Sequence, residues 1–229
     1  MLKSFRNGKK PTLNPSVKQN MPNVINQSHL EAGLSYAAYR ELIDNLLAQD
    51  KTTGSNQSAS YIEYTKLNVH RMRRVDKTLK LQPELVAELE KVNQSWVWVV
   101  LTEGWCGDAA QTVPVMAQIA ESSPHIQLYL LLRDEHLEVM DAYLTNGGRS
   151  IPKLICLNDK LETLGTWGPR PEPSQQLFDE FRQRYGEKFR DHYSEWSEQL
   201  QLWYARDRTK STQQELTQEI ANWLKAAKH

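Results

Sequence analysis

The chain has 229 residues, and its 28 Lys and Arg balance its 28 Asp and Glu, for a formal net charge of 0. This length fits one large domain or a domain with additions. The balanced charge gives no overall field that would attract nucleic acid or acidic lipid, which argues against both as partners. The 2 cysteines, Cys106 and Cys156, are too few for the disulfide framework of a small secreted domain.

Neither a membrane span nor a secretory signal is evident in the sequence. No apolar run approaches the roughly 20 residues that a membrane span needs. The N-terminus is basic but lacks the apolar segment of a secretory signal. By elimination, we expect a cytoplasmic protein.

The N-terminal part of the chain predicts an arm followed by helices. Residues 1–30 are polar and rich in turn signals, so we expect an irregular arm there. Apolar residues then recur at helical spacing over residues 35–48 and 61–79, which predicts an N-terminal helical extension over 31–80. Asn68 interrupts the apolar face of the second helix, and we expect it to be a buried, hydrogen-bonded amide.

Residues 81–185 alternate helical and strand patterns and form the predicted core. In chain order, the expected elements are a helix from Gln82, a strand over 97–101, a helix after Cys106, a strand over 126–132, a helix over 134–144, and a hairpin of strands over 152–157 and 161–167. Strands joined through helices imply a parallel pair, and the hairpin adds an antiparallel strand.

The last part of the chain predicts a C-terminal helical extension over 186–229. Aromatic residues recur every three or four positions over 174–204, as in one long amphipathic helix or two stacked helices with a kink at Gly186. These aromatic residues either pack in a core or form a surface that binds a partner. In the second case, the chain could form a homodimer through them. Thr212 and Glu215 form a capping-box pattern that predicts the start of a last helix.

Cys106 lies where an apolar strand passes into a helix. The first N–H groups of a helix have no internal partner and carry partial positive charge, which stabilises a thiolate. A carboxylate at Asp108 opposes this by like-charge repulsion, and the sequence does not decide between the two effects. Asp108 itself either stabilises the first helical turn or relays protons to and from the sulfur.

Two sets of motif residues resemble the thioredoxin family. Residues 105–107 (Trp-Cys-Gly) resemble the start of its WCGPC signature, and Pro114 matches the proline that kinks its long helix. Residues 150–154 (Ser-Ile-Pro-Lys-Leu) resemble the loop that carries its cis-proline. The run EGWCGDAAQ is similar to a bacterial thioredoxin-like subgroup. The resemblance covers roughly 82–185 and implies an α/β fold: a mixed four- to five-stranded sheet flanked by helices, here with extra N- and C-terminal helices.

The sequence departs from the family pattern at three positions. The resolving cysteine of the family would fall at Ala109, its buried acid at Val100, and its motif proline is replaced by Asp108. No disulfide can therefore form within the motif, and the usual internal proton acceptor is missing. Cys156 lies four residues beyond Pro152, about 13 Å along a strand, so we interpret it as a buried structural cysteine.

The resemblance leaves two functions open. In the first, Cys106 and Asp108 are the catalytic residues of a one-cysteine thiol–disulfide oxidoreductase, and glutathione or another small thiol is the co-substrate. The alternative is a non-catalytic binding module that recognises an extended peptide or a partner protein. The candidate substrate-binding residues are Trp105, Thr102, Gln111, Ile151 and Pro152.

The predicted partners are proteins or small thiols. If the peptide bond before Pro152 is cis, the resemblance implies that the backbone of Ile151 pairs with an extended substrate. We expect no resident cofactor and no metal, because His125 and His136 form no ligand pattern with Cys106.

Overall fold

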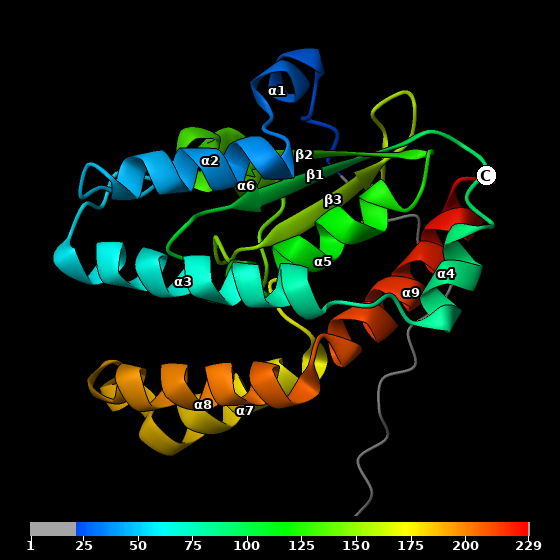
Figure 1. Cartoon of the computed structure of the whole chain (residues 1–229). Helices are drawn as coiled ribbons and strands as arrows, with labels where there is room; N and C mark the ends of the chain where they lie inside the picture. Colours follow the sequence, from blue (N-terminus) through cyan, green and yellow to red (C-terminus); the bar gives the residue numbers. More distant parts are fainter. Residues whose placement is uncertain (1–21, 229) are drawn as a thin grey trace, which may run out of the picture.

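A mixed sheet of four strands, in the order β2-β1-β3-β4, carries the fold (Figure 1). The strands are β1 (Trp96–Thr102), β2 (Ile126–Leu132), β3 (Lys153–Leu157) and β4 (Thr163–Trp167). β1 pairs parallel with β2 and antiparallel with β3, and β3 pairs antiparallel with β4. Every residue of β1 is buried, as its continuous apolar run predicted. The predicted α/β fold with a parallel pair and a terminal hairpin is confirmed.

Helices cover both faces of this sheet. They are α1 (Gln27–Ala32), α2 (Tyr36–Leu47), α3 (Ala59–Thr78), α4 (Pro83–Leu89), α5 (Ala109–Glu121), α6 (Leu137–Ala142), α7 (Glu172–Tyr185), α8 (Tyr193–Asp207) and α9 (Lys210–Ala226), with short 3-10 helices η1 (Arg133–Glu135) and η2 (Gly186–His192). Figure 1 shows α2 and α6 on one side of the sheet, α3, α5 and α9 on the other, and the α7–α8 pair beyond α3. The extra helices predicted at both ends of the core are thus present.

The structure is a computed structural model that describes residues 22–228, so most of the predicted N-terminal arm lies outside the described residues. Its last part is helical rather than irregular, because Asn26 caps α1. The Asn26 side chain accepts a hydrogen bond from Ser28 N, and Nδ1 of His29 accepts one from Asn26 N. Among the described residues, no helix is both long and apolar enough to cross a membrane.

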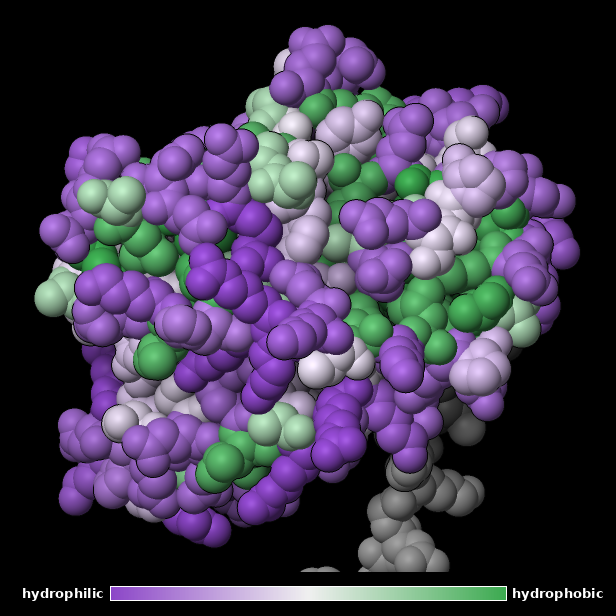
Figure 2. Space-filling model, in the orientation of Figure 1, coloured by the Kyte–Doolittle hydropathy of each residue, from purple (hydrophilic) through white to green (hydrophobic). Residues whose placement is uncertain are grey.

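The aromatic stripe forms two stacked helices, one of the two predicted arrangements. Gly186 ends α7 with a φ of 51°, a conformation that glycine adopts without a side-chain clash. The facing side chains of α7, η2 and α8 form a hydrophobic cluster of their own: Phe181, Phe189, Trp196, Leu200 and Tyr204. On the face shown in Figure 2, the α7–α8 pair is mostly hydrophilic outside. A homodimer through these helices stays a prediction.

The capping box predicted at Thr212 is wrong. α9 begins at Lys210, and Thr212 lies inside the helix, buried. The Glu215 carboxylate instead accepts hydrogen bonds from Trp167 Nε1 at 2.9 Å and from Glu172 N at 2.6 Å. Glu215 thus joins α9 to the end of β4 and the start of α7. Its carboxylate oxygens are engaged in these long-range hydrogen bonds rather than in a cap at the start of α9.

One tryptophan fixes α9 against the sheet. The ring of Trp223 meets the rings of Trp96 and Trp98 edge to face, with centroids 6.2 and 5.9 Å apart. A Cβ atom at Gly165 in β4 would lie 1.9 Å from Trp223 Nε1. The helix can approach β4 this closely only because position 165 has no side chain.

We therefore expect Gly165→Ala to lower the free energy of unfolding by about 1–3 kcal/mol, because the Trp223 ring must move to admit the methyl group. Urea unfolding followed by tryptophan fluorescence measures this change. Gly148→Ala is the matched control, since its Cβ would meet nothing closer than Thr145 O at 3.4 Å. Equal stabilities of the two variants would contradict this packing.

Candidate functional site

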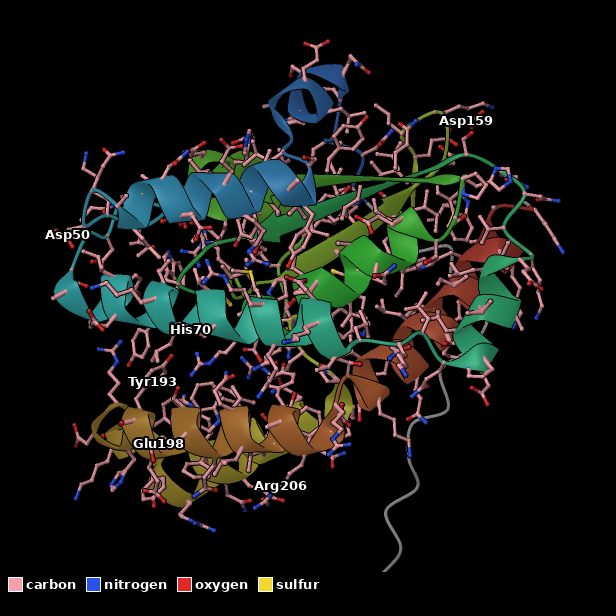
Figure 3. All side chains as sticks on the ribbon, viewed as in Figure 1. Asp50, His70, Asp159, Tyr193, Glu198 and Arg206 are labelled. Atoms are coloured by element: carbon pink, nitrogen blue, oxygen red, sulfur yellow. The ribbon has the colours of Figure 1, made fainter. Side chains whose placement is uncertain are left out.

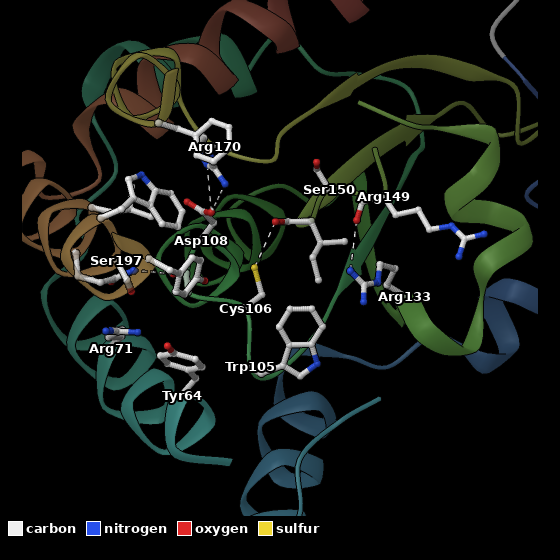
Figure 4. Close-up of a pocket in the computed structure, with 17 residues that line it drawn as sticks. Tyr64, Arg71, Trp105, Cys106, Asp108, Arg133, Arg149, Ser150, Arg170 and Ser197 are labelled. Atoms are coloured by element: carbon white, nitrogen blue, oxygen red, sulfur yellow. Dashed lines mark hydrogen bonds and ion pairs between the residues drawn. The ribbon is translucent and has the colours of Figure 1, made fainter. Parts of the chain in front are cut away.

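Cys106 is held between the start of α5 and the loop before β3. Its Sγ donates a hydrogen bond to the backbone oxygen of Ile151 at 3.3 Å and accepts one from Ala109 N at 3.4 Å (Figure 4). The peptide bond between Ile151 and Pro152 is cis, as the resemblance implied. Cys106 is 8% exposed and lines the cavity beside it.

That cavity has a volume of about 280 Å³ and walls that are aromatic and cationic. Of the predicted site residues, Cys106, Asp108, Trp105 and Ile151 line it. The opposite wall comes from helices outside the motif, with side chains of α3, α7 and α8. The site is therefore built jointly by the motif and by the added helices.

The other three predicted site residues do not line the cavity. Thr102 is fully buried, and its hydroxyl oxygen lies 3.3 Å from Tyr39 Oη. Gln111 accepts from Arg74 at 3.0 Å and donates to Gln201 at 2.6 Å, so it links α3 to α8 rather than reaching Asp108 or a ligand. Pro152 is buried and contributes through the conformation of its peptide bond.

The Asp108 carboxylate joins the motif to the C-terminal part of the chain. Oδ2 accepts from Arg170 Nε at 3.1 Å and Nη2 at 2.8 Å, and Oδ1 accepts from the Tyr204 hydroxyl at 2.6 Å. The side chain makes no capping hydrogen bond to α5. Both oxygens of Asp108 are thus engaged by Arg170 and Tyr204, and its two predicted roles, stabilising the first helical turn by its charge or relaying protons, stay predictions.

Sequence reasoning missed Arg170 and Tyr204. Arg170 follows β4 between two prolines, and its guanidinium stacks over Phe178 at 4.9 Å and Trp196 at 5.4 Å. Tyr204 ends the aromatic stripe of α8. Their positions carry no local pattern that points to Asp108, because the pairing is between residues far apart in the sequence.

Burial is the largest cause that raises the pKa of the Cys106 thiol, the charge of Asp108 raises it as well, and the resulting pKa is about 12. The backbone N–H groups of Ala109 and Asp108, and the charge of Arg170, act in the lowering direction. The thiolate suggested by the helix N-terminus is therefore not the resting form. At neutral pH the sulfur carries its proton and donates it to Ile151 O.

A buried acid that the sequence did not single out lies just before the motif. Glu103 is fully buried, its Oε1 accepts from Asp134 N at 2.9 Å, and burial raises the pKa of its carboxyl group. The next residue, Gly104, donates its N–H to Thr53 and accepts from Asn68 Nδ2 at 2.9 Å. The prediction of a buried, bonded amide at Asn68 is confirmed, and these bonds fix the loop that leads to Cys106.

A second group of side chains has the atom types of a metal site. Nitrogens of His29 and His136 and a carboxylate oxygen of Glu138 lie within 4.8 Å of one another, in a group that does not include Cys106. Nδ1 of His29 accepts a hydrogen bond from Asn26 N, so Nε2 keeps its proton and faces Glu138 Oε1 at 3.3 Å. The geometry thus fits the cap of α1 better than metal ligation, which would need a deprotonated Nε2.

The buried ion pair gives a prediction with an internal control. Arg170→Gln leaves Asp108 in the interior without its cation, and we expect the free energy of unfolding to fall by about 3–5 kcal/mol. Arg149→Gln removes a pair of similar geometry with Asp141, whose two side chains are 49% and 48% exposed, and should change stability little. Urea unfolding of both variants measures the difference, and similar losses would contradict the role of burial.

Comparisons with solved structures bear on the fold. A crystal structure of an HIV epitope-scaffold has a TM-score of 0.52 and 18% sequence identity, and the match covers 88% of this chain and 96% of that chain. At this identity the likeness shows the fold alone. A protein of unknown function, PA1234 from Pseudomonas aeruginosa, has a TM-score of 0.49 and 14% identity over 87% of this chain and 94% of its own.

No curated protein matches the chain. A family model described as thioredoxin matches residues 54–182, which is more than half of the sequence. The match runs from the loop before α3 into α7. The cis-proline loop and the strand-to-helix position of Cys106 lie within the match. The chain belongs to the thioredoxin family.

Proposed function

We propose that the protein acts through a single thiol, forming a mixed disulfide between Cys106 and a sulfur compound bound in the cavity. The observation that carries this proposal is the position of Sγ in the cavity wall, 3.3 Å from the backbone oxygen that precedes the cis-proline.

The proposed reaction proceeds in two balanced steps. Cys106 attacks a disulfide RSSR, one S–S bond breaks and another forms, and RSH leaves with the proton that the Cys106 thiol has lost. Ala109 offers no second thiol in the motif. A small thiol such as glutathione must therefore attack the sulfur of R in the mixed disulfide. A new disulfide between the small thiol and R forms, the bond to Cys106 breaks, and the proton lost by the small thiol restores the Cys106 thiol.

The protonated thiol makes this exchange slow at neutral pH. With a pKa of about 12, the thiolate fraction at pH 7 is on the order of 10⁻⁵. Loss of the negative charge at Asp108 would raise this fraction, because the positive charge of Arg170 would remain beside the sulfur.

We expect the rate of Cys106 alkylation by iodoacetamide to rise about tenfold per pH unit between roughly pH 7 and 10. Asp108→Asn should move this profile to lower pH, since the amide oxygen still accepts hydrogen bonds but carries no charge. Asp159→Asn, on the exposed turn between β3 and β4, is the control and should leave the profile unchanged. Peptide mapping by mass spectrometry assigns the label. A rate that levels off below about pH 9 would contradict the raised pKa.

The exchange itself is tested with oxidised glutathione and with bis(2-hydroxyethyl) disulfide at about pH 9. We expect one adduct per chain on Cys106, reversed by added glutathione, and none on Cys156, which is 0% exposed. Cys106→Ser should form no adduct. If Cys106 stays unmodified by both disulfides over hours at this pH, the proposed chemistry is lost.

One observation favours a second function, a binding module without chemistry. Cys106 is nearly buried and protonated, as a packing residue would be. In that case an extended peptide or partner protein would bind beside Ile151, and Cys106→Ala would bind it as tightly as the unchanged protein. Absence of any adduct together with unchanged binding would decide for this alternative.

A further inference from the structure

The cavity beside Cys106 has more positive charge than its neighbours neutralise. Three of the four arginines in its walls have carboxylate partners: Arg170 with Asp108, Arg133 with Asp134, and Arg149 with Asp141. For the fourth, Arg71 of α3, no carboxylate lies within 4.0 Å among residues 22–228. A cation in a partly enclosed space attracts an anion that can enter it.

Arg71 is held in place beside the motif. Its Nη1 donates to Asn68 Oδ1 at 2.7 Å, and Asn68 is itself fully buried and bonded to Gly104 O. Nη1 also lies 3.8 Å from the point where a Cβ at Gly107 would be. The guanidinium is therefore next to the residue that follows Cys106, and a neutral amide orients it without neutralising it.

The surroundings of Arg71 disfavour its own positive charge, which an anion beside it would stabilise. Burial and the nearby charge of Arg74 lower the pKa of the Arg71 guanidinium. Figure 4 shows Arg71 and Tyr64 on α3 at one side of Cys106, with Arg133 and Arg149 at the other. Tyr193 lies between α8 and α3 (Figure 3), with its ring 6.4 Å from that of Tyr64. Both tyrosines line the cavity together with Arg71.

We propose that Arg71 binds the carboxylate of a small thiol or disulfide whose sulfur faces Cys106. This inference rests on the proposed thiol exchange and names its substrate class. The planar guanidinium matches a carboxylate in two parallel hydrogen bonds. The cavity volume of about 280 Å³ lies just below the roughly 300–1,000 Å³ of small-molecule sites, which favours a small ligand.

The test compares two disulfides of similar size. One is 3,3′-dithiodipropionate, which carries two carboxylates, and the other is bis(2-hydroxyethyl) disulfide, which is neutral. The rate of mixed-disulfide formation on Cys106 is measured by mass spectrometry for each, and the anionic-to-neutral rate ratio is compared between variants. We expect this ratio to fall about tenfold in Arg71→Gln, and less in Arg71→Lys, which keeps the charge but loses the planar fork. Using the ratio removes the intrinsic difference between the two reagents.

Arg73→Gln is the matched control, because Arg73 lies on the same helix, is exposed, and pairs with Asp44 at 3.6 Å. Its ratio should equal that of the unchanged protein. Thermal unfolding shows whether each variant is folded. If both disulfides react with Cys106 and Arg71→Gln leaves the ratio unchanged, the anion site is overturned while the proposed exchange stands.

A second measurement separates the two proposals when no disulfide reacts. Adipate has the two carboxylates of the anionic probe without its S–S bond, and its binding to Cys106→Ala can be followed by NMR shifts. Saturable binding that Arg71→Gln abolishes in this background supports the anion site without any thiol chemistry. Absence of saturable adipate binding, or binding that Arg71→Gln does not weaken, overturns it.

Discussion

The buried ion pair between Asp108 and Arg170 is the interaction on which the site depends. The side chains are 7% and 12% exposed, so each charge has lost most of its water and relies on the other. The Tyr204 hydroxyl completes the group from α8. Together they hold the α7–α8 pair over the motif, and this places an additional wall around the cysteine. The cavity exists because of helices that lie outside the central sheet and its immediate cover.

Burial is the main reason why the sulfur keeps its proton, and the same pair acts on the sulfur as well. A helix N-terminus alone would favour a thiolate at Cys106. Here Asp108 places a negative charge near the sulfur and raises the pKa of the thiol. Arg170 acts in the opposite direction, but its guanidinium is paired with the Asp108 carboxylate. Burial acts in the same direction as Asp108. The thiol is consequently neutral at rest. With Ala109 in place of a second cysteine, the motif also lacks the second thiol with which a dithiol site releases a mixed disulfide.

Local patterns predicted the parts of the fold that local physics determines. The apolar run of β1 and the break at Gly186 are properties of adjacent residues, and both were confirmed. The cis peptide bond before Pro152 followed from the resemblance. Arg170 could not be predicted as the partner of Asp108, because no periodicity connects residues so distant in the chain. The capping box at Thr212 failed for the same reason, since Glu215 is taken by a long-range contact with Trp167.

In the proposed exchange, the charge of the ligand is kept apart from the reacting sulfur. An anion directly against Sγ would raise the pKa of Cys106 further and slow the exchange. If Arg71 of α3 holds the carboxylate of the ligand, the negative charge stays beside the guanidinium. Only the uncharged sulfur of the ligand then comes close to Cys106. In the proposed exchange, substrate preference would depend on Arg71, and the rate at a given pH would depend on Asp108. Two arginine–carboxylate contacts, one internal and one supplied by the ligand, would thus divide recognition from reactivity in a site with a single cysteine.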